Sequence, residues 1–238
     1  MADLRNYQNR MSQTRAQTGT GIDEGLRAYM LKVYNLMALG MAITGVAAYG
    51  TYALAVSNPA FANLLFASPL RWVIMLAPLG LVFFLSFRIN SMSVGTAQAT
   101  FWGYAALMGV SLSSIFIVFT GESIVQTFLV TAASFGALSL YGYTTKKDLS
   151  GLGSFLIMGL FGLIIASIVN IFLQSSAMGF AISAIGVLIF AGLTAYDTQK
   201  IKEMYFDGDD ALVAGRKAIM GALTLYLDFI NLFMFLLQ

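Results

Sequence analysis

The chain has 238 residues, of which 58% are hydrophobic and only 10% are charged. A soluble domain carries about 25% charged residues, so this chain would expose a largely apolar surface in water. It has neither cysteine nor histidine, which removes disulfides, thiol nucleophiles, imidazole zinc sites and the usual haem ligands. The basic residues behind the net charge of +2 form no stripe that could follow phosphates, which argues against a nucleic-acid partner. We therefore expect an integral membrane protein that contacts the lipid bilayer and needs no cofactor.

The N-terminal part is polar and basic, and a long apolar run follows it. This run, residues 33–56, is too long for the core of a cleaved signal peptide. We predict a cytosolic N-terminal tail over residues 1–32 and a transmembrane domain over residues 33–238.

Seven segments are long and apolar enough to cross the hydrocarbon core, which takes about 20 residues in a helix. The predicted fold class is an all-α membrane protein, a seven-transmembrane-helix bundle without a second domain. The polar loop 200–213 is the one sizeable connection, and Asp209 or Asp210 is expected to cap the helix that follows it. The predicted spans are 33–56, 71–88, 98–119, 123–143, 153–173, 177–199 and 214–237.

The basic residues are distributed unevenly between the two ends of this bundle. Every lysine and arginine except Arg71 falls on the side that holds the N-terminus. Because cytosolic loops are enriched in lysine and arginine, the N-terminus is predicted to be cytosolic and Gln238 to lie on the opposite side. Six spans followed by a re-entrant or interfacial last segment would keep most of this asymmetry and is the alternative.

Two of the eleven acidic residues, Asp197 and Asp228, lie within predicted spans. An aspartate in the middle of a membrane helix costs about 2.5–3.5 kcal/mol on insertion scales, so it normally faces a partner or a water-filled cavity. Asp197 lies near the cytosolic end of its span and three residues before Lys200, and an ion pair between the two would explain it without any function.

Asp228 has no basic neighbour on its own helix. It lies eleven residues beyond Lys217, about 16 Å at the helical rise, which places it close to mid-membrane. Thr224 and Asn231 lie on the same helix face. We expect these two polar residues to hydrogen-bond Asp228 and to line a pore.

Asp197 and Asp228 together could form a switch that needs no histidine. Two carboxylates in a low dielectric cannot both ionise cheaply, so the pair would share a proton and titrate as a unit. When ionised, it would attract Ca²⁺, although calcium takes six to eight oxygen ligands. Straight spans that begin at Lys200 and Lys217 would separate the two acids by about 10 Å in depth. They meet if the sixth span continues past Lys200 toward Phe206, or if the seventh starts later.

The sequence around these residues resembles the transmembrane Bax-inhibitor-motif family, whose bacterial members are small inner-membrane proteins. The resemblance covers nearly the whole chain after the N-terminal tail. It is most specific at LYLDFINLF, residues 225–233. It implies a seven-helix bundle whose last helix is surrounded by the other six. The segments that carry the resemblance are AYDTQKIK at 195–202, LYLDFINLF at 225–233 and KKDLSGLGSFL at 146–156.

The resemblance also implies an activity, a pH-sensitive calcium leak controlled by aspartates on helices six and seven. Matched by motif, these are Asp197 and Asp228, the residues already selected by their cost. In the family, an arginine near the end of helix two latches one of the aspartates in the closed state, and the nearest candidate here is Arg88 in LSFRINS. The loop between helices six and seven is longer than in the bacterial members compared.

We therefore interpret the chain as a cation leak channel or transporter for Ca²⁺ in a bacterial inner membrane, gated by protonation of the Asp197–Asp228 pair. The alternative is an adaptor that binds other membrane proteins, such as a membrane protease, with the aspartates in a structural role. No nucleophile–base set is visible, so we expect no enzymatic activity.

The uneven distribution of basic residues predicts the topology of the termini. A reporter fused to the N-terminus should be active only as a cytosolic reporter, and one fused after Gln238 only on the opposite side. Activity of a cytosolic reporter at Gln238 would contradict the seven-span arrangement and favour a re-entrant last segment.

Overall fold

The computed structural model describes the backbone of residues 2–238 and the side chains of residues 24–238. Within this range every regular element is a helix and no strand is present, which confirms the all-α prediction. Seven helical spans are long and apolar enough to cross a membrane, one for each predicted span. They cover Glu24–Ser57, Leu70–Ser91, Val94–Val118, Gly121–Thr144, Ser150–Leu173, Ser176–Glu203 and Ala211–Leu237.

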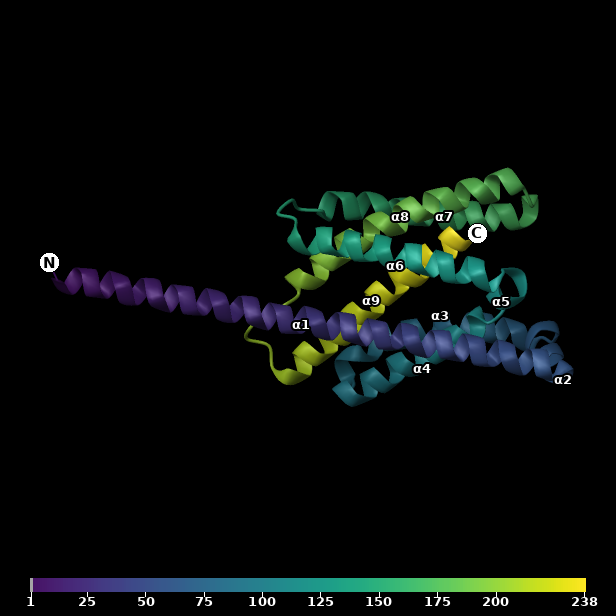
Figure 1. Cartoon of the computed structure of the whole chain (residues 1–238), viewed down its shortest axis with the longest axis horizontal. Helices are drawn as coiled ribbons and strands as arrows, with labels where there is room; N and C mark the ends of the chain where they lie inside the picture. Colours follow the sequence, from purple (N-terminus) through teal and green to yellow (C-terminus); the bar gives the residue numbers. More distant parts are fainter. Residues whose placement is uncertain (1) are drawn as a thin grey trace.

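The long helices are joined by short connections, some of which form brief helical turns of their own (Figure 1). The long helices are α1 (Ala2–Ser57), α3 (Leu70–Arg88), α4 (Val94–Leu112), α6 (Gly121–Thr144), α7 (Ser150–Leu173), α8 (Ser176–Glu203) and α9 (Ala211–Leu237). The short elements are α2 (Pro59–Ala62), the π-helical turn η1 (Asn63–Ala67), the 3₁₀ turn η2 (Ile89–Ser91) and α5 (Ile115–Val118).

Helix α1 runs without a break through the boundary expected after residue 32. Tyr29 and Met30 are already buried in the main hydrophobic core. The ring of Tyr29 lies 5.7 Å from the ring of Tyr205, which follows the end of α8. The packed bundle therefore begins before residue 33, and the division into a cytosolic tail and a membrane domain stays a prediction.

Hydroxyl and carboxylate side chains mark where several helices begin. Ser93, Thr120 and Ser175 each accept a hydrogen bond from the backbone N–H three residues further on, and they start α4, α6 and α8. Asp210 does the same for α9 by accepting from Val213 N at 2.7 Å. These bonds satisfy N–H groups that the first helical turn leaves free. The prediction that Asp209 or Asp210 caps this helix is therefore confirmed, with Asp210 in the role.

Helix α9 crosses the bundle diagonally between two groups of helices (Figure 1). One group contains α1, α3 and α4, and the other contains α6, α7 and α8. Helix α9 packs mainly against α1 and α4 on one side and α6 and α8 on the other. In its most apolar stretch 61% of the residues are buried, the largest share of the seven spans. The expectation that all six other helices surround it stays a prediction.

Helices α6 and α8 approach each other at a glycine. A Cβ atom at Gly142 would overlap the backbone carbonyl of Ala195 on α8. Membrane helices gain little hydrophobic drive for association within lipid, so close approach at small residues is one of their main sources of contact energy. This contact fixes the spacing of α6 from the helix that carries Asp197.

The close approach predicts that Gly142→Ala destabilises the protein by about 1–3 kcal/mol, because the added methyl group must displace backbone rather than a flexible side chain. Gly136→Ala on the same helix is the matched control, since a Cβ there would have no atom within 4 Å. Thermal unfolding of the purified proteins in detergent measures both. Equal melting temperatures for the two variants would contradict the tight α6–α8 contact.

Candidate functional site

The carboxyl groups of Asp197 on α8 and Asp228 on α9 line the same cavity and lie close enough to interact directly. Asp228 is only 4% exposed. Its Oδ2 atom has no hydrogen-bond donor among the residues whose side chains the structure describes. Two carboxyl groups in close contact attract each other only if one carries a proton, because an ionised carboxylate can accept but not donate a hydrogen bond and two ionised groups repel. The structure therefore brings the two sequence-predicted aspartates together as a pair.

Straight helices would place Asp197 and Asp228 at different depths in the membrane. The length of α8 and the tilt of α9 bring the two residues together. Helix α8 continues past Lys200 to Glu203, which is one of the two conditions for contact. Helix α9 starts at Ala211, earlier than Lys217 rather than later. Its diagonal course across the bundle (Figure 1) means that distance along α9 is not depth along α8.

A cavity of about 590 Å³ lies beside the pair, between α7, α8 and α9. Both aspartates line it, together with Thr224 and Asn231, the two polar residues predicted to share the face of Asp228. Thr224 Oγ1 donates to the Met220 carbonyl at 3.0 Å, and Asn231 Nδ2 donates to the Leu227 carbonyl at 2.8 Å. The expectation that these two residues hydrogen-bond Asp228 was therefore wrong: the Thr224 hydroxyl and one of the two N–H groups of Asn231 bond carbonyls of their own helix. Their oxygen lone pairs remain for the cavity.

Helix α7 supplies the apolar wall of this cavity, and the polar groups are concentrated on α8 and α9. The α7 residues that line it are Ile157, Leu160, Leu163, Ile164, Ser167, Ile168 and Ile171. A site with one apolar wall and a few convergent polar groups is the usual form of a pocket that binds a small ligand or ion.

Lys200 also lines the cavity but forms no ion pair with Asp197. Its ammonium group lies over the ring of Tyr196, 5.8 Å from the ring centroid. The one ion pair among the residues described is Lys217 with Asp209 at 2.5 Å, at the start of α9. An interfacial salt bridge therefore does not account for Asp197 in this structure, although the charge of Lys200 acts on it at longer range.

Arg88, the candidate latch, lies away from the aspartates. It ends α3, its side chain is exposed, and it is not among the residues that line the cavity. Its backbone carbonyl accepts from Ser91 Oγ at 2.9 Å. The structure thus does not bring Arg88 to the pair, and the latch stays a prediction.

Gln199 forms two hydrogen bonds to the loop between α6 and α7 that were not predicted from the sequence. It is buried on α8, where Nε2 donates to the Lys147 carbonyl and Oε1 accepts from Leu149 N, both at 2.8 Å. Lys202 adds a bond from Nζ to the Tyr143 carbonyl at 2.8 Å. These bonds tie the α6–α7 loop to the end of α8. The only feature of the sequence that could have indicated these bonds is the position of Gln199, two residues after the intramembrane Asp197.

The described residues include no cluster of three or more acidic, histidine or cysteine side chains that could hold a metal ion. Two carboxylates with the oxygens of Thr224 and Asn231 offer about four to six oxygens, depending on whether each carboxylate binds through one or both, which is at or below the lower end of the six to eight that calcium takes. Such a set suits a weakly held, passing cation better than a resident one.

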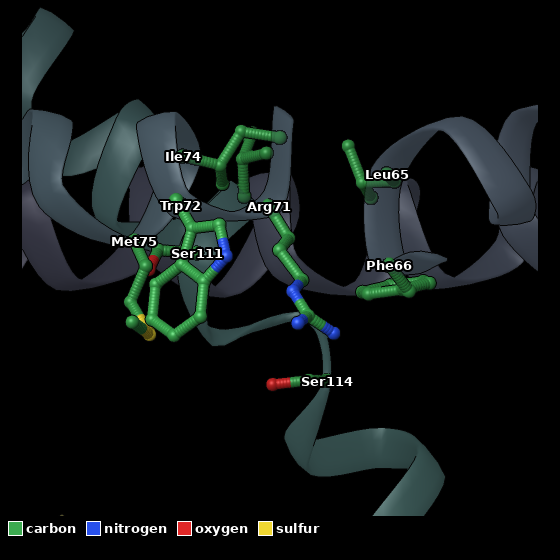
Figure 2. Close-up of a pocket in the computed structure, with 9 residues that line it drawn as sticks. Leu65, Phe66, Arg71, Trp72, Ile74, Met75, Ser111 and Ser114 are labelled. Atoms are coloured by element: carbon green, nitrogen blue, oxygen red, sulfur yellow. The ribbon is translucent and has the colours of Figure 1, made fainter. Parts of the chain in front are cut away.

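A smaller cavity of about 230 Å³ contains Arg71, the basic residue that departs from the charge asymmetry. Figure 2 shows its side chain extending between Trp72 and Phe66, with the guanidinium toward Ser114. The guanidinium carbon lies 5.1 Å from the centre of the Trp72 ring, a cation–π contact. Trp and Arg side chains are common anchors where a helix enters the lipid headgroups, which accounts for Arg71 at this end.

Comparison with known proteins identifies the family. The family described as "Inhibitor of apoptosis-promoting Bax1" matches residues 26–238. The chain belongs to this family. It is 51% identical to the uncharacterized protein RP147 of Rickettsia prowazekii over 91% of this chain and 90% of that protein. It is 50% identical to the inner membrane protein YbhL of Escherichia coli K12 over 90% of this chain and 91% of that protein.

Membership of the Bax inhibitor family confirms the resemblance drawn from the motifs around Asp197 and Asp228. The matched region begins at residue 26, within the first of the helical spans. It spans all seven membrane helices. The chain is therefore an integral membrane protein of the Bax inhibitor family over its whole packed bundle.

The carboxyl pair predicts a pH-dependent effect of Asp228→Asn on stability. At low pH the wild-type pair holds a proton and its contact is satisfied, so the variant should match the wild type. As pH rises and the proton is lost, the asparagine amide still donates to Asp197, whereas two carboxylates repel. The variant should then be more stable by about 1.5–3 kcal/mol, the scale of a hydrogen bond to a charged group.

Melting temperatures of both proteins at pH 5 and pH 8 measure this effect, with Glu122→Gln on α6 as an exposed charge-removal control. Unfolding of Asp228→Asn at every pH would show instead that Asp228 is a structural anchor.

Proposed function

We propose that this protein is a cation leak channel or transporter for Ca²⁺, and that protonation of the Asp197–Asp228 pair controls it. The observation that supports the proposal is that both carboxyl groups contact each other at the wall of one cavity. A structural acid would need a satisfied hydrogen-bond partner, whereas Asp228 Oδ2 is buried and has none among the side chains that the structure describes. Intramembrane carboxyl groups of this kind are typical of ion and proton pathways.

The charge state of the pair changes two properties of the site together. With one proton present, the carboxyl groups attract each other and hold α8 against α9. Without it, two unit charges about 4 Å apart repel by roughly 4 kcal/mol at an effective dielectric of 20. The same ionised oxygens attract a divalent cation. A gap of a few kcal/mol is enough to shift a protein between two conformations, so protonation can act as a switch.

Two stacked aromatic rings also line the cavity, one from each helix that carries an aspartate. Phe190 on α8 and Phe235 on α9 both line the cavity, and their rings stack 5.7 Å apart. Each lies seven residues from the aspartate of its own helix, toward the end of the bundle that lacks the basic loops. Apolar constrictions of this kind close a pore by excluding water. Cation passage therefore requires that α8 and α9 separate at these rings.

The remaining parts of the proposal concern location and direction. The basic residues support a cytosolic position for the loops next to Lys147 and Lys200. The relative from Escherichia coli is named an inner membrane protein, which supports the same membrane for this chain. Calcium then crosses between the cytosol and the opposite face by way of the α7–α8–α9 cavity, and the protein needs no catalytic group.

The proposal predicts that Ca²⁺ flux through the purified protein in liposomes depends on pH between 6 and 8. Asp197→Asn and Asp228→Asn should each flatten this dependence, because asparagine keeps the shape of the side chain and removes its titration. Glu122→Gln, which removes an exposed carboxylate from α6, should keep the wild-type profile. A Ca²⁺-sensitive dye inside the liposomes provides the measurement.

Two results would contradict the proposal. Wild-type pH dependence in both asparagine variants would remove the sensing role of the pair. Absence of any flux above that of empty liposomes would favour the adaptor alternative, in which the protein acts through other membrane proteins.

A further inference from the structure

A third cavity, of about 460 Å³, lies between α1 and α6 and differs in character from the carboxylate cavity. Its wall is mostly apolar and includes Leu31 on α1 and Leu140 on α6. Gly136 leaves it open, because a Cβ there would have no atom within 4 Å. We call this cavity, with the residues that line it, the α1–α6 groove. Its volume lies within the range of about 300–1,000 Å³ that holds small organic ligands.

The α1–α6 groove lies on the seam between the two helix groups. Helix α1 packs on α4 and α9, whereas α6 packs on α8 and α9. The two sides are bridged by a hydrogen bond of 2.6 Å between the hydroxyls of Tyr34 and Ser139, both of which line the groove. Ser139 Oγ lies in turn 2.9 Å from the hydroxyl of Thr198 on α8.

One end of the α1–α6 groove is cationic. Arg27 lines it there with its side chain exposed. Tyr143 lines the same cavity, and its ring and carbonyl are both contacted by the ammonium group of Lys202. Gly25 and Tyr29 of α1 pack against Tyr205 in the α8–α9 loop. This end of the groove therefore lies at the level of the loops, where lipid head groups would be, with the Asp207 carboxylate next to Tyr205 as well as the basic residues.

An apolar groove with cations at its membrane-surface end matches the shape and charge of an anionic lipid. Arginine presents a planar fork of donors that fits phosphate oxygens. Basic side chains next to the membrane attract anionic head groups. An acyl chain gains little by leaving bilayer for groove, because both are apolar. Selectivity for such a lipid must therefore come from the head group and from the room beside Gly136.

We propose that the α1–α6 groove binds an anionic phospholipid from the leaflet next to the basic loops. The phosphate contacts Arg27, and one acyl chain lies along Leu31, Gly136 and Leu140. The lipid bridges the two helix groups at the seam that Tyr34 and Ser139 span. This site is separate from the carboxylate cavity and does not depend on calcium flux.

The test is lipid binding to the purified full-length protein in detergent, followed by native mass spectrometry. The probes are phosphatidylglycerol and phosphatidylcholine with identical acyl chains. The wild type should retain phosphatidylglycerol more tightly. Arg27→Gln should weaken its binding about fivefold or more, the effect expected of one basic residue on an anionic lipid.

A groove-filling variant tests the position of the acyl chain. Gly136→Leu should reduce retention of phosphatidylglycerol, whereas Gly162→Leu on α7, which also has no atom within 4 Å of an added Cβ, should not. Lys146→Gln is the control for loss of an exposed cation outside the groove. Thermal unfolding without added lipid checks that each variant is folded.

The outcomes separate the proposal from general lipid contact. Equal retention of the two lipids by the wild type would overturn it. So would unchanged phosphatidylglycerol binding in both folded variants, Arg27→Gln and Gly136→Leu. An equal loss of binding in Lys146→Gln and Arg27→Gln would show that overall positive charge, rather than this groove, attracts the lipid.

Discussion

Helix α9 carries a carboxyl group, that of Asp228, at a position in the bundle where it is almost completely buried. An isolated charge in this position is costly, and it persists only with a partner or a polar cavity. The structure supplies both to Asp228, in the carboxyl of Asp197 and in the cavity beside α7. The position of α8 relative to α9 therefore decides whether Asp228 has an interaction partner. The contacts that hold α8 in place are for this reason important for the site.

Helix α8 is held firmly on its other side. Gly142 allows α6 to approach the backbone at Ala195, and Gln199 and Lys202 bond carbonyl or amide groups at the end of α6 and in its following loop. None of these contacts includes a carboxylate, so their strength does not change when a carboxyl in the bundle gains or loses a proton. The α8–α9 contact at Asp197 does change. On the proposed function, titration of the pair would act on the α8–α9 interface and leave the α6–α8 interface intact.

Several parts of this arrangement could be predicted from single-helix arguments. Span length and hydrophobicity predict the seven helices, and the spacing of Thr224 and Asn231 predicts their common face with Asp228 because a helix repeats every 3.6 residues. The contact of Asp197 with Asp228 was only a conditional prediction, since it depends on the tilt of α9, which is set by packing between helices. The two bonds of Gln199 to a loop about 50 residues earlier in the chain were not predictable, because no local pattern encodes them. Arg88 was a candidate only because the family resemblance implies an arginine near the end of the second helix, and Arg88 is not among the residues that line the cavity of the pair.

The seam between α1 and α6 also contacts α8, on the side of that helix away from the carboxyl pair. Ser139 bonds both Tyr34 of α1 and Thr198, the residue that follows Asp197 on α8. A change in the spacing of the two helix groups would therefore act on α8 within one residue of the carboxyl pair. Coupling between two sites requires an element with two arrangements that both sites bias. Helix α8 fits that requirement, because Asp197 faces the carboxylate cavity while Thr198 bonds toward the α1–α6 seam. A lipid that spans the seam and a proton on the pair would then act on one shared equilibrium, and each would alter the affinity for the other by the same factor.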